Sequence, residues 1–313
     1  MVPLERAILN TLVWFDLWHQ PLTAFECWYF LWNEDGLVAD SIPSEVSSAL
    51  ISLENKKLVK INRNFWQLAD SPSYTEERLA RARWSIGKRQ RAERVAKLIM
   101  KLPFVRLVAL ANTNASEGAK RDSDIDLLII VKAGRIFLSR LLITTLVQLL
   151  GWRRHGVKVA NRICLSFYLA DNELNIKSLA YPDDPYLIYW LASLQPLADF
   201  GTFNNLLADN AWAQNFIPHR YLVFKAANTQ TVANSKLIWP EQALVGRLGD
   251  VLEYGARRLQ LFLISRHKDS RLGDGSSAVV VSNNILKFHE SDQRPQLAKN
   301  FRERQQQILA KYI

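Results

Sequence analysis

The sequence is poor in cysteine, with only Cys27 and Cys164 among its 313 residues. They lie far apart in apolar contexts and neither belongs to a C-x-x-C pair, which argues against a disulfide framework and against a zinc site. The five histidines lack the paired spacing of an H-E-x-x-H motif, so we expect them to be surface or core residues. Metal binding through sulfur or imidazole therefore has no support in the sequence.

No apolar run has the length and composition of a membrane span. The best candidate, residues 136–152 (IFLSRLLITTLVQLLGW), contains Arg140 and Gln148. A span needs about 20 predominantly apolar residues, and a central arginine costs about 2.5–3.5 kcal/mol on insertion. We therefore predict a buried helix packed on a sheet, and no membrane partner. The N-terminal residues also lack the pattern of a secretory signal peptide, so we expect a cytoplasmic protein.

What the sequence has in excess is positive charge. It contains 40 lysines and arginines against 30 aspartates and glutamates, which gives a formal net charge of +10. Such a charge suits a polyanionic partner such as RNA, DNA or a nucleoside phosphate, although many proteins that bind no nucleic acid share it. With 49% apolar residues, the chain is long enough for two or three domains with their own cores.

Residues 1–72 are patterned as three helices followed by a hairpin. Apolar residues recur at helical spacing from Leu4 to Phe15, Thr23 can cap a second helix, and a third begins near Pro43. Two short apolar runs on either side of residues 62–64 (NRN) then predict a β-hairpin. This order resembles a winged helix. Because the third helix offers few basic residues to a DNA groove, the domain is compatible with nucleic-acid binding and with protein or substrate docking.

Residues 73–101 are predicted to form a basic connecting helix, which Gly87 is expected to interrupt. From residue 74 to residue 101 the segment contains nine lysines and arginines against three glutamates. This positive charge is compatible with the solvated face of a connecting helix. It is also compatible with a stripe that contacts phosphates, because the neutralisation of phosphate charges by lysine and arginine dominates the affinity of proteins for nucleic acids.

Two aspartates one residue apart, Asp124 and Asp126, stand at the start of the apolar run SDIDLLIIV, residues 123–131. On a strand such side chains point to the same face, roughly 6.6–6.8 Å apart along the backbone, so both carboxylates can converge on one cation. Burial of two like charges without a counter-ion costs on the order of several kcal/mol each. We therefore predict a strand whose two acids hold a divalent metal.

A second strand-like run, residues 104–110 (FVRLVAL), ends just before the turn residues Asn112 and Thr113. The segment between this turn and the aspartates is small, polar and basic. Two adjacent strands would therefore bring a hydroxyl-bearing turn and a carboxylate pair to the same end of one sheet.

The string ANTNASEGAKRDSDIDLLIIV, residues 111–131, resembles the signature of the polymerase β-type nucleotidyltransferase superfamily. In that signature a Gly-Ser turn precedes a Ser-Asp-hydrophobic-Asp strand. Asn112 stands at the glycine position, Thr113 at the serine position, and Asp124 and Asp126 at the two metal-binding acids. Residues 163–169 (ICLSFYL) are also similar to the later strand of bacterial nucleotidyltransferase-domain proteins, which often reads ICLN followed by aromatic residues.

The resemblance implies an α+β protein with a nucleotidyltransferase core of mixed sheet and helices at residues 102–185. It implies that Asp124 and Asp126 are catalytic and bind Mg²⁺, while Asn112, Thr113 and Ser123 bind a nucleoside triphosphate. The implied reaction is transfer of a nucleoside monophosphate to an acceptor, which could be a nucleic acid or a protein.

Active members of the superfamily usually carry a third carboxylate on a later strand. The corresponding run here, residues 162–169, contains no acid; Ser166 is one candidate for the position, and Asp171 and Glu173 follow the run. The absence of an acid in this run leaves three interpretations open. The chain could catalyse transfer with two acids, it could recruit one of the later acids, or it could bind a nucleotide without transferring it. The alternative function is a catalytically degraded nucleotidyltransferase-fold protein that acts as a nucleic-acid-binding or regulatory protein.

From residue 186 to residue 313 the pattern is helical, with tryptophans and leucines at helical spacing. We predict a helical C-terminal domain in which Trp190 and Trp212 belong to a core. In the superfamily, such helices often cover the nucleotide cleft and select the acceptor.

Overall fold

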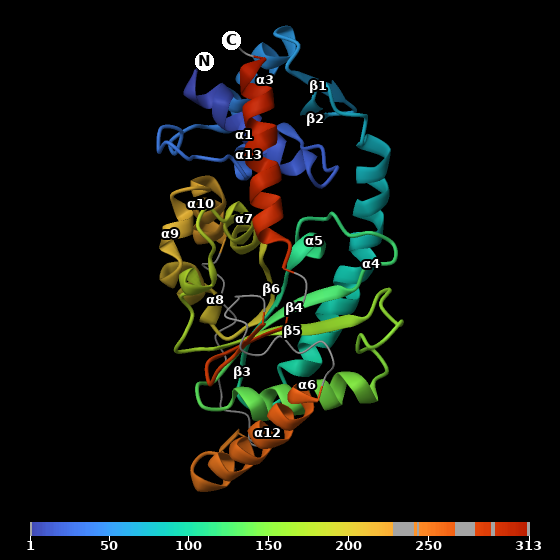
Figure 1. The fold of residues 1–313 in the computed structure, drawn as a ribbon, viewed down its shortest axis with the longest axis vertical. Helices are drawn as coiled ribbons and strands as arrows, with labels where there is room; N and C mark the ends of the chain where they lie inside the picture. Colours follow the sequence, from blue (N-terminus) through green and yellow to red (C-terminus); the bar gives the residue numbers. More distant parts are fainter. Residues whose placement is uncertain (1, 228–240, 243, 267–278, 289–291, 312–313) are drawn as a thin grey trace.

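The computed structural model describes residues 2–227, 241–242, 244–266, 279–288 and 292–311, with residues 113–114 and 224–227 described by their backbone only. Three parts follow one another along the longest axis of the molecule (Figure 1). A helical unit built from the N-terminal residues lies at one end, and a β-sheet covered by helices lies in the middle. Two helices from distant parts of the sequence lie at the opposite end.

The N-terminal unit contains the three helices and the hairpin that the sequence predicts. Thr23 caps the second helix as predicted, since its hydroxyl accepts a hydrogen bond from the Glu26 amide, and the Glu26 carboxylate accepts one from the Thr23 amide. The hairpin strands pair antiparallel. Membership of the winged-helix class stays a prediction. The elements are α1 (Pro3–Asp16), α2 (Ala24–Tyr29), α3 (Pro43–Asn55), β1 (Val59–Asn62) and β2 (Phe65–Leu68).

A helix from the other end of the chain, α13 (Arg294–Ala310), completes the core of this unit. Phe301 is fully buried, and its ring lies edge-on against Trp14 at 5.7 Å and Trp32 at 5.8 Å between ring centroids. In Figure 1, α13 (red) runs along the N-terminal unit, and the two chain ends lie near each other. The N-terminal helices therefore share one hydrophobic core with the last described helix.

We expect Phe301→Ala to lower the free energy of unfolding by about 3–5 kcal/mol, because it removes a buried aromatic ring and leaves a cavity between two tryptophans. Urea unfolding followed by tryptophan fluorescence measures this loss. Gln306→Ala, at an exposed position of the same helix, is the matched control. A loss no larger than that of the control would show that α13 does not complete this core.

The connecting helix α4 (Thr75–Ile99) is continuous, so the interruption expected at Gly87 is wrong. A glycine weakens a helix by about 1 kcal/mol relative to alanine, which a long, packed helix tolerates. Of the basic residues in α4, Arg78, Arg81 and Lys88 are buried, and Arg78 forms an ion pair with Glu26 at 2.7 Å. Part of the predicted basic stripe therefore serves to attach the helix to its neighbours.

The middle part is a six-stranded mixed sheet of order β6-β3-β4-β5-β8-β7. Neighbouring strands are antiparallel except for β4 and β5, which are parallel and are joined by a crossover through α6 (Ile136–Leu149). The strands are β3 (Val105–Leu110), β4 (Ile125–Val131), β5 (Ile163–Ala170), β6 (Gln195–Asp199), β7 (Val279–Val281) and β8 (Ile285–Phe288). The α+β class and the three predicted strands at β3, β4 and β5 are confirmed, while the polymerase β-like assignment stays a prediction.

Helices cover both faces of the sheet. α4 and α6 pack on one face, where Val108 and Ile129 belong to the core, and α7 (Pro185–Ser193) and α8 (Thr202–Asp209) pack on the other, where Leu128 and Ile130 belong to it. Burial on both faces explains why β4 is a continuous apolar run after Asp126.

Among the described helices, none is long and apolar enough to cross a membrane. The helix α6, which contains most of the apolar run at residues 136–152, packs on the sheet as predicted.

The prediction of a helical C-terminal domain at residues 186–313 is wrong in part, because β6, β7 and β8 also come from this segment. β7 and β8 read VVV and ILKF on either side of SNN, and runs this short carry no measurable period. β6 contains Pro196 and lies at the sheet edge, so its composition also gives little strand signal. The other described helices of the segment are α9 (Ala211–Gln214), α10 (Pro218–Ala227) and α12 (Arg247–Ser265).

Candidate functional site

The two predicted metal-binding acids lie at the start of β4 and point to the same side. Asp124 directly precedes the strand and Asp126 is its second residue, while Ile125 between them is buried in the opposite direction. One oxygen from each carboxylate and the sulfur of Cys164 lie within 4.8 Å of one another. Within the described part of the chain, this is the only such group of potential metal ligands.

Cys164 occupies the place next to Asp126 on the neighbouring parallel strand, since the two residues are partners in the β4–β5 register. Burial raises the pKa of the Cys164 thiol to about 12, so the sulfur carries no charge at neutral pH. Ser166, the predicted candidate for this place, lies two residues further along and accepts a hydrogen bond from the Cys164 sulfur at 3.4 Å. The sequence interpretation of Cys164 as a core residue missed its position beside the acids.

Asp171 lies at the opposite end of the sheet from the acid pair. Its amide donates to the carbonyl of Val131, the last residue of β4, and its carboxylate accepts from the Ala133 amide at 2.8 Å. Because β4 and β5 run parallel, an acid that follows β5 cannot reach the start of β4. Recruitment of Asp171 as a third ligand is therefore excluded, and no third carboxylate among the described residues joins the cluster.

Arg154 lies beside the acids, which sequence reasoning did not foresee. Its Nη1 atom donates to the Asp124 Oδ2 atom at 2.6 Å. Backbone hydrogen bonds between Ile163 and both Trp152 and Arg154 hold this segment against the start of β5. The guanidinium thus supplies the counter-charge that Asp124 requires, from a side chain that is itself about half exposed (48%).

Asp126 has an unfavourable electrostatic environment. Burial, and secondly the charge of Asp124, raise the pKa of Asp126 to about 6, although hydrogen bonding with the side chains of Asn112 and Cys164 lowers it. A carboxylate held in this way is charged at neutral pH only against a free-energy cost. A bound divalent cation would remove that cost, because it offsets both negative charges.

The turn after β3 lies directly beside Asp126, as the sequence predicts. The Ala111 amide donates to the Asp126 carbonyl at 3.0 Å, and Asn112 follows with a left-handed φ of 56° at the start of α5 (Asn112–Ala115). Asparagine adopts this conformation more readily than most residues, and glycine adopts it freely. Asn112 can therefore provide the backbone geometry of a glycine. The side chain of Thr113 lies outside the described residues.

Ser123 is close to the acids in sequence, but its hydroxyl donates to the carbonyl of Lys120 at 3.1 Å, within its own loop. Its carbonyl accepts a hydrogen bond from the buried ammonium of Lys88, which also donates to the Asn161 Oδ1 atom at 3.0 Å. Lys88 therefore joins the loop before β4 to the loop before β5. This contact, from α4, fixes the two strand starts at which Asp124 and Cys164 lie.

Two adjoining cavities open beside the turn, with volumes of about 260 and 300 Å³. Both are lined by Trp18, Asn112, Tyr186 and Trp190, and the smaller one also reaches Asp126. Aromatic side chains therefore form much of the wall next to the acid pair. Such a wall suits a flat, apolar ring with a few polar substituents.

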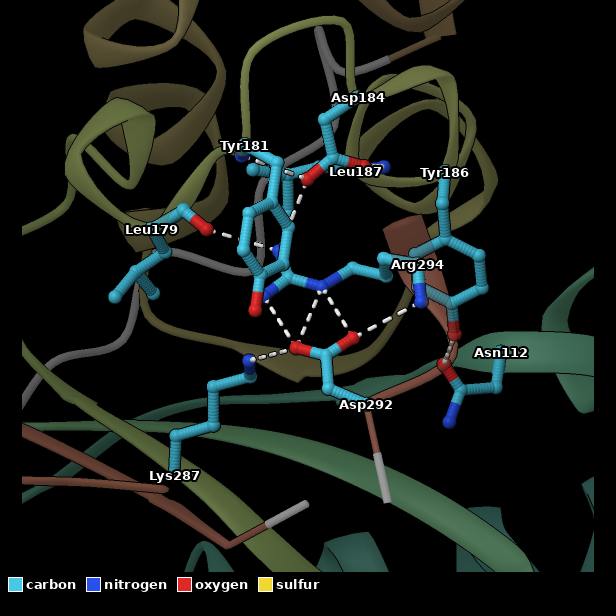
Figure 2. Close-up of polar contacts among 9 residues, drawn as sticks. All are labelled: Asn112, Leu179, Tyr181, Asp184, Tyr186, Leu187, Lys287, Asp292 and Arg294. Atoms are coloured by element: carbon cyan, nitrogen blue, oxygen red, sulfur yellow. Dashed lines mark hydrogen bonds and ion pairs between the residues drawn. The ribbon is translucent and has the colours of Figure 1, made fainter. Parts of the chain in front are cut away.

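Charged residues form the far wall of the larger cavity. Figure 2 shows the guanidinium of Arg294 between the carboxylates of Asp184 and Asp292, at 3.0 and 2.6 Å, with Lys287 facing Asp292 at 3.7 Å. The Tyr186 hydroxyl in the same view donates to the Asn112 Oδ1 atom at 3.1 Å. Asp184 also caps α7, so this cluster connects α13 to the helix that carries Tyr186.

Oxygen ligands from two carboxylates fit Mg²⁺, which keeps several waters and needs few protein ligands. The protonated thiol of Cys164 does not suit this hard cation. Asp124 and Asp126 are thus the residues that could hold it.

No protein-family model matches the chain, and a search of curated proteins found no match either.

We expect Asp126→Asn to raise the free energy of unfolding at pH 8, without metal, by on the order of 2 kcal/mol. The folded pKa, about 6, lies above the unfolded value, so the stability that this carboxyl contributes is complete below about pH 4 and is lost as the pH rises through 6. Urea titrations at pH 8 and pH 4.5 measure the gain, which should shrink at the lower pH.

Asp122→Asn is the control for this substitution, because Asp122 is exposed in the loop before β4. It should change stability little at either pH. Equal destabilisation of the Asp126→Asn protein at both pH values would contradict the unfavourable charge that we assign to Asp126.

Proposed function

We propose that the chain is a magnesium-dependent nucleotidyltransferase that transfers a nucleoside monophosphate from a nucleoside triphosphate to an acceptor. The observation that supports this proposal is the convergence of Asp124 and Asp126 beside the Asn112 turn, at the mouth of an aromatic cavity. Two carboxylates that are held together at a free-energy cost, and a cavity with aromatic walls beside them, are the features that a metal–nucleotide complex requires.

In this proposal Asp124 and Asp126 would hold the cation, and the chemistry it would supply is neutralisation of the triphosphate and its alignment for in-line attack. The guanidinium of Arg154, which is about half exposed beside Asp124, would contact a phosphate oxygen of the bound nucleotide. Thr113 contributes the hydroxyl of the turn to the phosphates. The base would occupy the cavity that Trp18, Tyr186 and Trp190 line, where aromatic contacts favour a planar group.

With Mg²⁺, the four labelled triphosphates and a cell extract as acceptor source, we expect release of pyrophosphate. Asp126→Asn should lower the rate at least about 100-fold, because it removes a charge that positions the reacting phosphate. Asp122→Asn should retain the activity. Since Asp126→Asn is expected to stabilise the fold, loss of activity in this variant cannot be attributed to unfolding.

The proposal fails if no triphosphate releases pyrophosphate under any of these conditions, or if the Asp126→Asn protein releases it as fast as the unmodified chain. Omission of the divalent cation supplies a second control, because the proposed reaction requires it.

A second candidate function is nucleotide binding without transfer, in a nucleic-acid-binding or regulatory protein. The observation that favours it is Cys164, a neutral thiol beside Asp126 where the resemblance implies a third carboxylate. The exposed basic residues near the site, among them Arg154 and Lys158, would attract a nucleic acid in either case.

Cys164→Asp distinguishes the two candidates. If the chain binds a nucleotide but has lost transfer, we expect this variant to bind Mg²⁺ about tenfold more tightly, because affinity for such cations follows the charge of the ligand set. It should also release pyrophosphate where the unmodified chain does not. Cys164→Asn is the isosteric control without charge. If the unmodified chain releases pyrophosphate and the Cys164→Asp variant does not, the second candidate is excluded.

A further inference from the structure

The aromatic wall of the cavities is connected to the acid pair by a chain of hydrogen bonds. The Tyr186 hydroxyl donates to the Asn112 Oδ1 atom at 3.1 Å, as Figure 2 shows. The same amide side chain is also hydrogen-bonded to the carboxyl group of Asp126. One amide group therefore lies between the hydroxyl of a cavity residue and a candidate metal ligand.

The donor and the acceptor in each of these contacts follow from their chemistry. An ionised carboxylate only accepts hydrogen bonds, so the Asn112 amide turns its NH₂ group toward Asp126. The amide oxygen is then available to Tyr186, whose hydroxyl must donate. Burial, and secondly the charge of Asp126, raise the pKa of the Tyr186 hydroxyl well above its usual value, so this proton is present at neutral pH. Tyr186 thus orients the amide, and the amide orients the carboxylate.

Tyr186 is itself held in place from two directions. Asp184 caps α7, because its Oδ1 atom accepts from the Leu187 amide at 2.9 Å, and its Oδ2 atom accepts from Arg294 at 3.0 Å (Figure 2). The ring of Tyr186 also lies edge-on to Trp14, at 6.5 Å between ring centroids. The hydroxyl therefore projects from the first turn of a helix that is anchored to α13.

The conformation of Asn112 gives its side chain a specific purpose. Its φ of 56° lies in the left-handed region, which glycine adopts freely and which costs other residues more. A glycine would therefore satisfy the backbone of this turn at least as well. What an asparagine adds is the amide group, and that group contacts Tyr186 and Asp126.

We propose that Tyr186 is a positioning residue for the metal site and acts through Asn112 on the carboxylate of Asp126. This inference rests on the proposed function, because it assigns that carboxylate to a cation. Groups that hydrogen-bond to a metal ligand orient it, and their removal typically lowers metal affinity by about 10–100-fold. Since Tyr186 also lines both cavities, a molecule bound in either of them contacts the residue that positions the acid.

Calorimetric titration of the full chain with magnesium chloride tests the proposal. Tyr186→Phe keeps the ring and removes the hydroxyl, and we expect it to raise the dissociation constant for Mg²⁺ at least about threefold. Asn112→Gly preserves the left-handed backbone, and it should raise the constant about tenfold. In the double variant, Tyr186→Phe should cause no further loss, because its effect passes through Asn112. An unchanged constant in Tyr186→Phe overturns the proposal.

Tyr189→Phe is the matched control. It removes a hydroxyl from the same helix, but this hydroxyl donates to the Phe30 carbonyl, at 3.3 Å, and not to Asn112. It should leave the affinity for Mg²⁺ unchanged. An equal loss of affinity in Tyr189→Phe and Tyr186→Phe would show a general effect on the packing of α7, and would overturn the proposal.

The dependence of pyrophosphate release on Mg²⁺ separates positioning from loss of a ligand. At limiting Mg²⁺ we expect Tyr186→Phe to be slower than the unmodified chain, and excess Mg²⁺ should restore its rate, because both carboxylates are still present. Excess Mg²⁺ should not restore Asp126→Asn, which has lost a charged ligand. A defect in Tyr186→Phe that persists at saturating Mg²⁺ contradicts a role in positioning the metal ligand.

A measurement without metal distinguishes failure of this inference from failure of the proposed function. In urea titrations at pH 8, the combined effect of Tyr186→Phe and Asp126→Ala on the unfolding equilibrium constant should differ at least about threefold from the product of the single effects. In the Asn112→Gly chain this coupling should disappear. Absence of Mg²⁺ binding by the unmodified chain would contradict the proposed function, and the coupling then decides the inference. Coupling that requires Asn112 supports it, and independent effects overturn it.

Discussion

The parallel pairing of β4 with β5 is the constraint on which the candidate site depends. It places Cys164 beside Asp126, and it brings the segment that carries Arg154 to the start of both strands. The same pairing directs Asp171 to the far end of the sheet. One choice of strand direction thus decides which side chains surround the acids, and the crossover through α6 makes that choice, because a parallel pair needs a long connection.

Charge compensation around the acids comes from several elements that are distant in sequence. Arg154 balances Asp124, Asn112 hydrogen bonds with Asp126, and Lys88 of α4 joins the loops that precede the two strands. Asp126 nevertheless keeps a raised pKa, so the compensation is incomplete. A purely structural site would have little reason to retain such a pair, since apolar residues at the start of a buried strand would stabilise it more.

Local pattern was sufficient to predict much of the fold and part of the site. The apolar run after Asp126 predicted β4, and the two short apolar runs on either side of residues 62–64 predicted the hairpin. Cys164 and Arg154 could not be placed, because the register of two strands separated by a helix depends on packing rather than on local sequence. The sequence did not predict the short strands β7 and β8 for a different reason, because runs of three and four residues are too short to show a period.

The shared core of α1 and α13 has a consequence for the order in which the protein can fold during synthesis. The tryptophans of the N-terminal unit leave the ribosome well before Phe301 and Ile308, which pack into the same core. Until then the unit exposes an aromatic surface that its own residues cannot cover. The N-terminal unit can therefore reach its final structure only after α13 has been made, and its exposed aromatic surface is prone to aggregation in the interval.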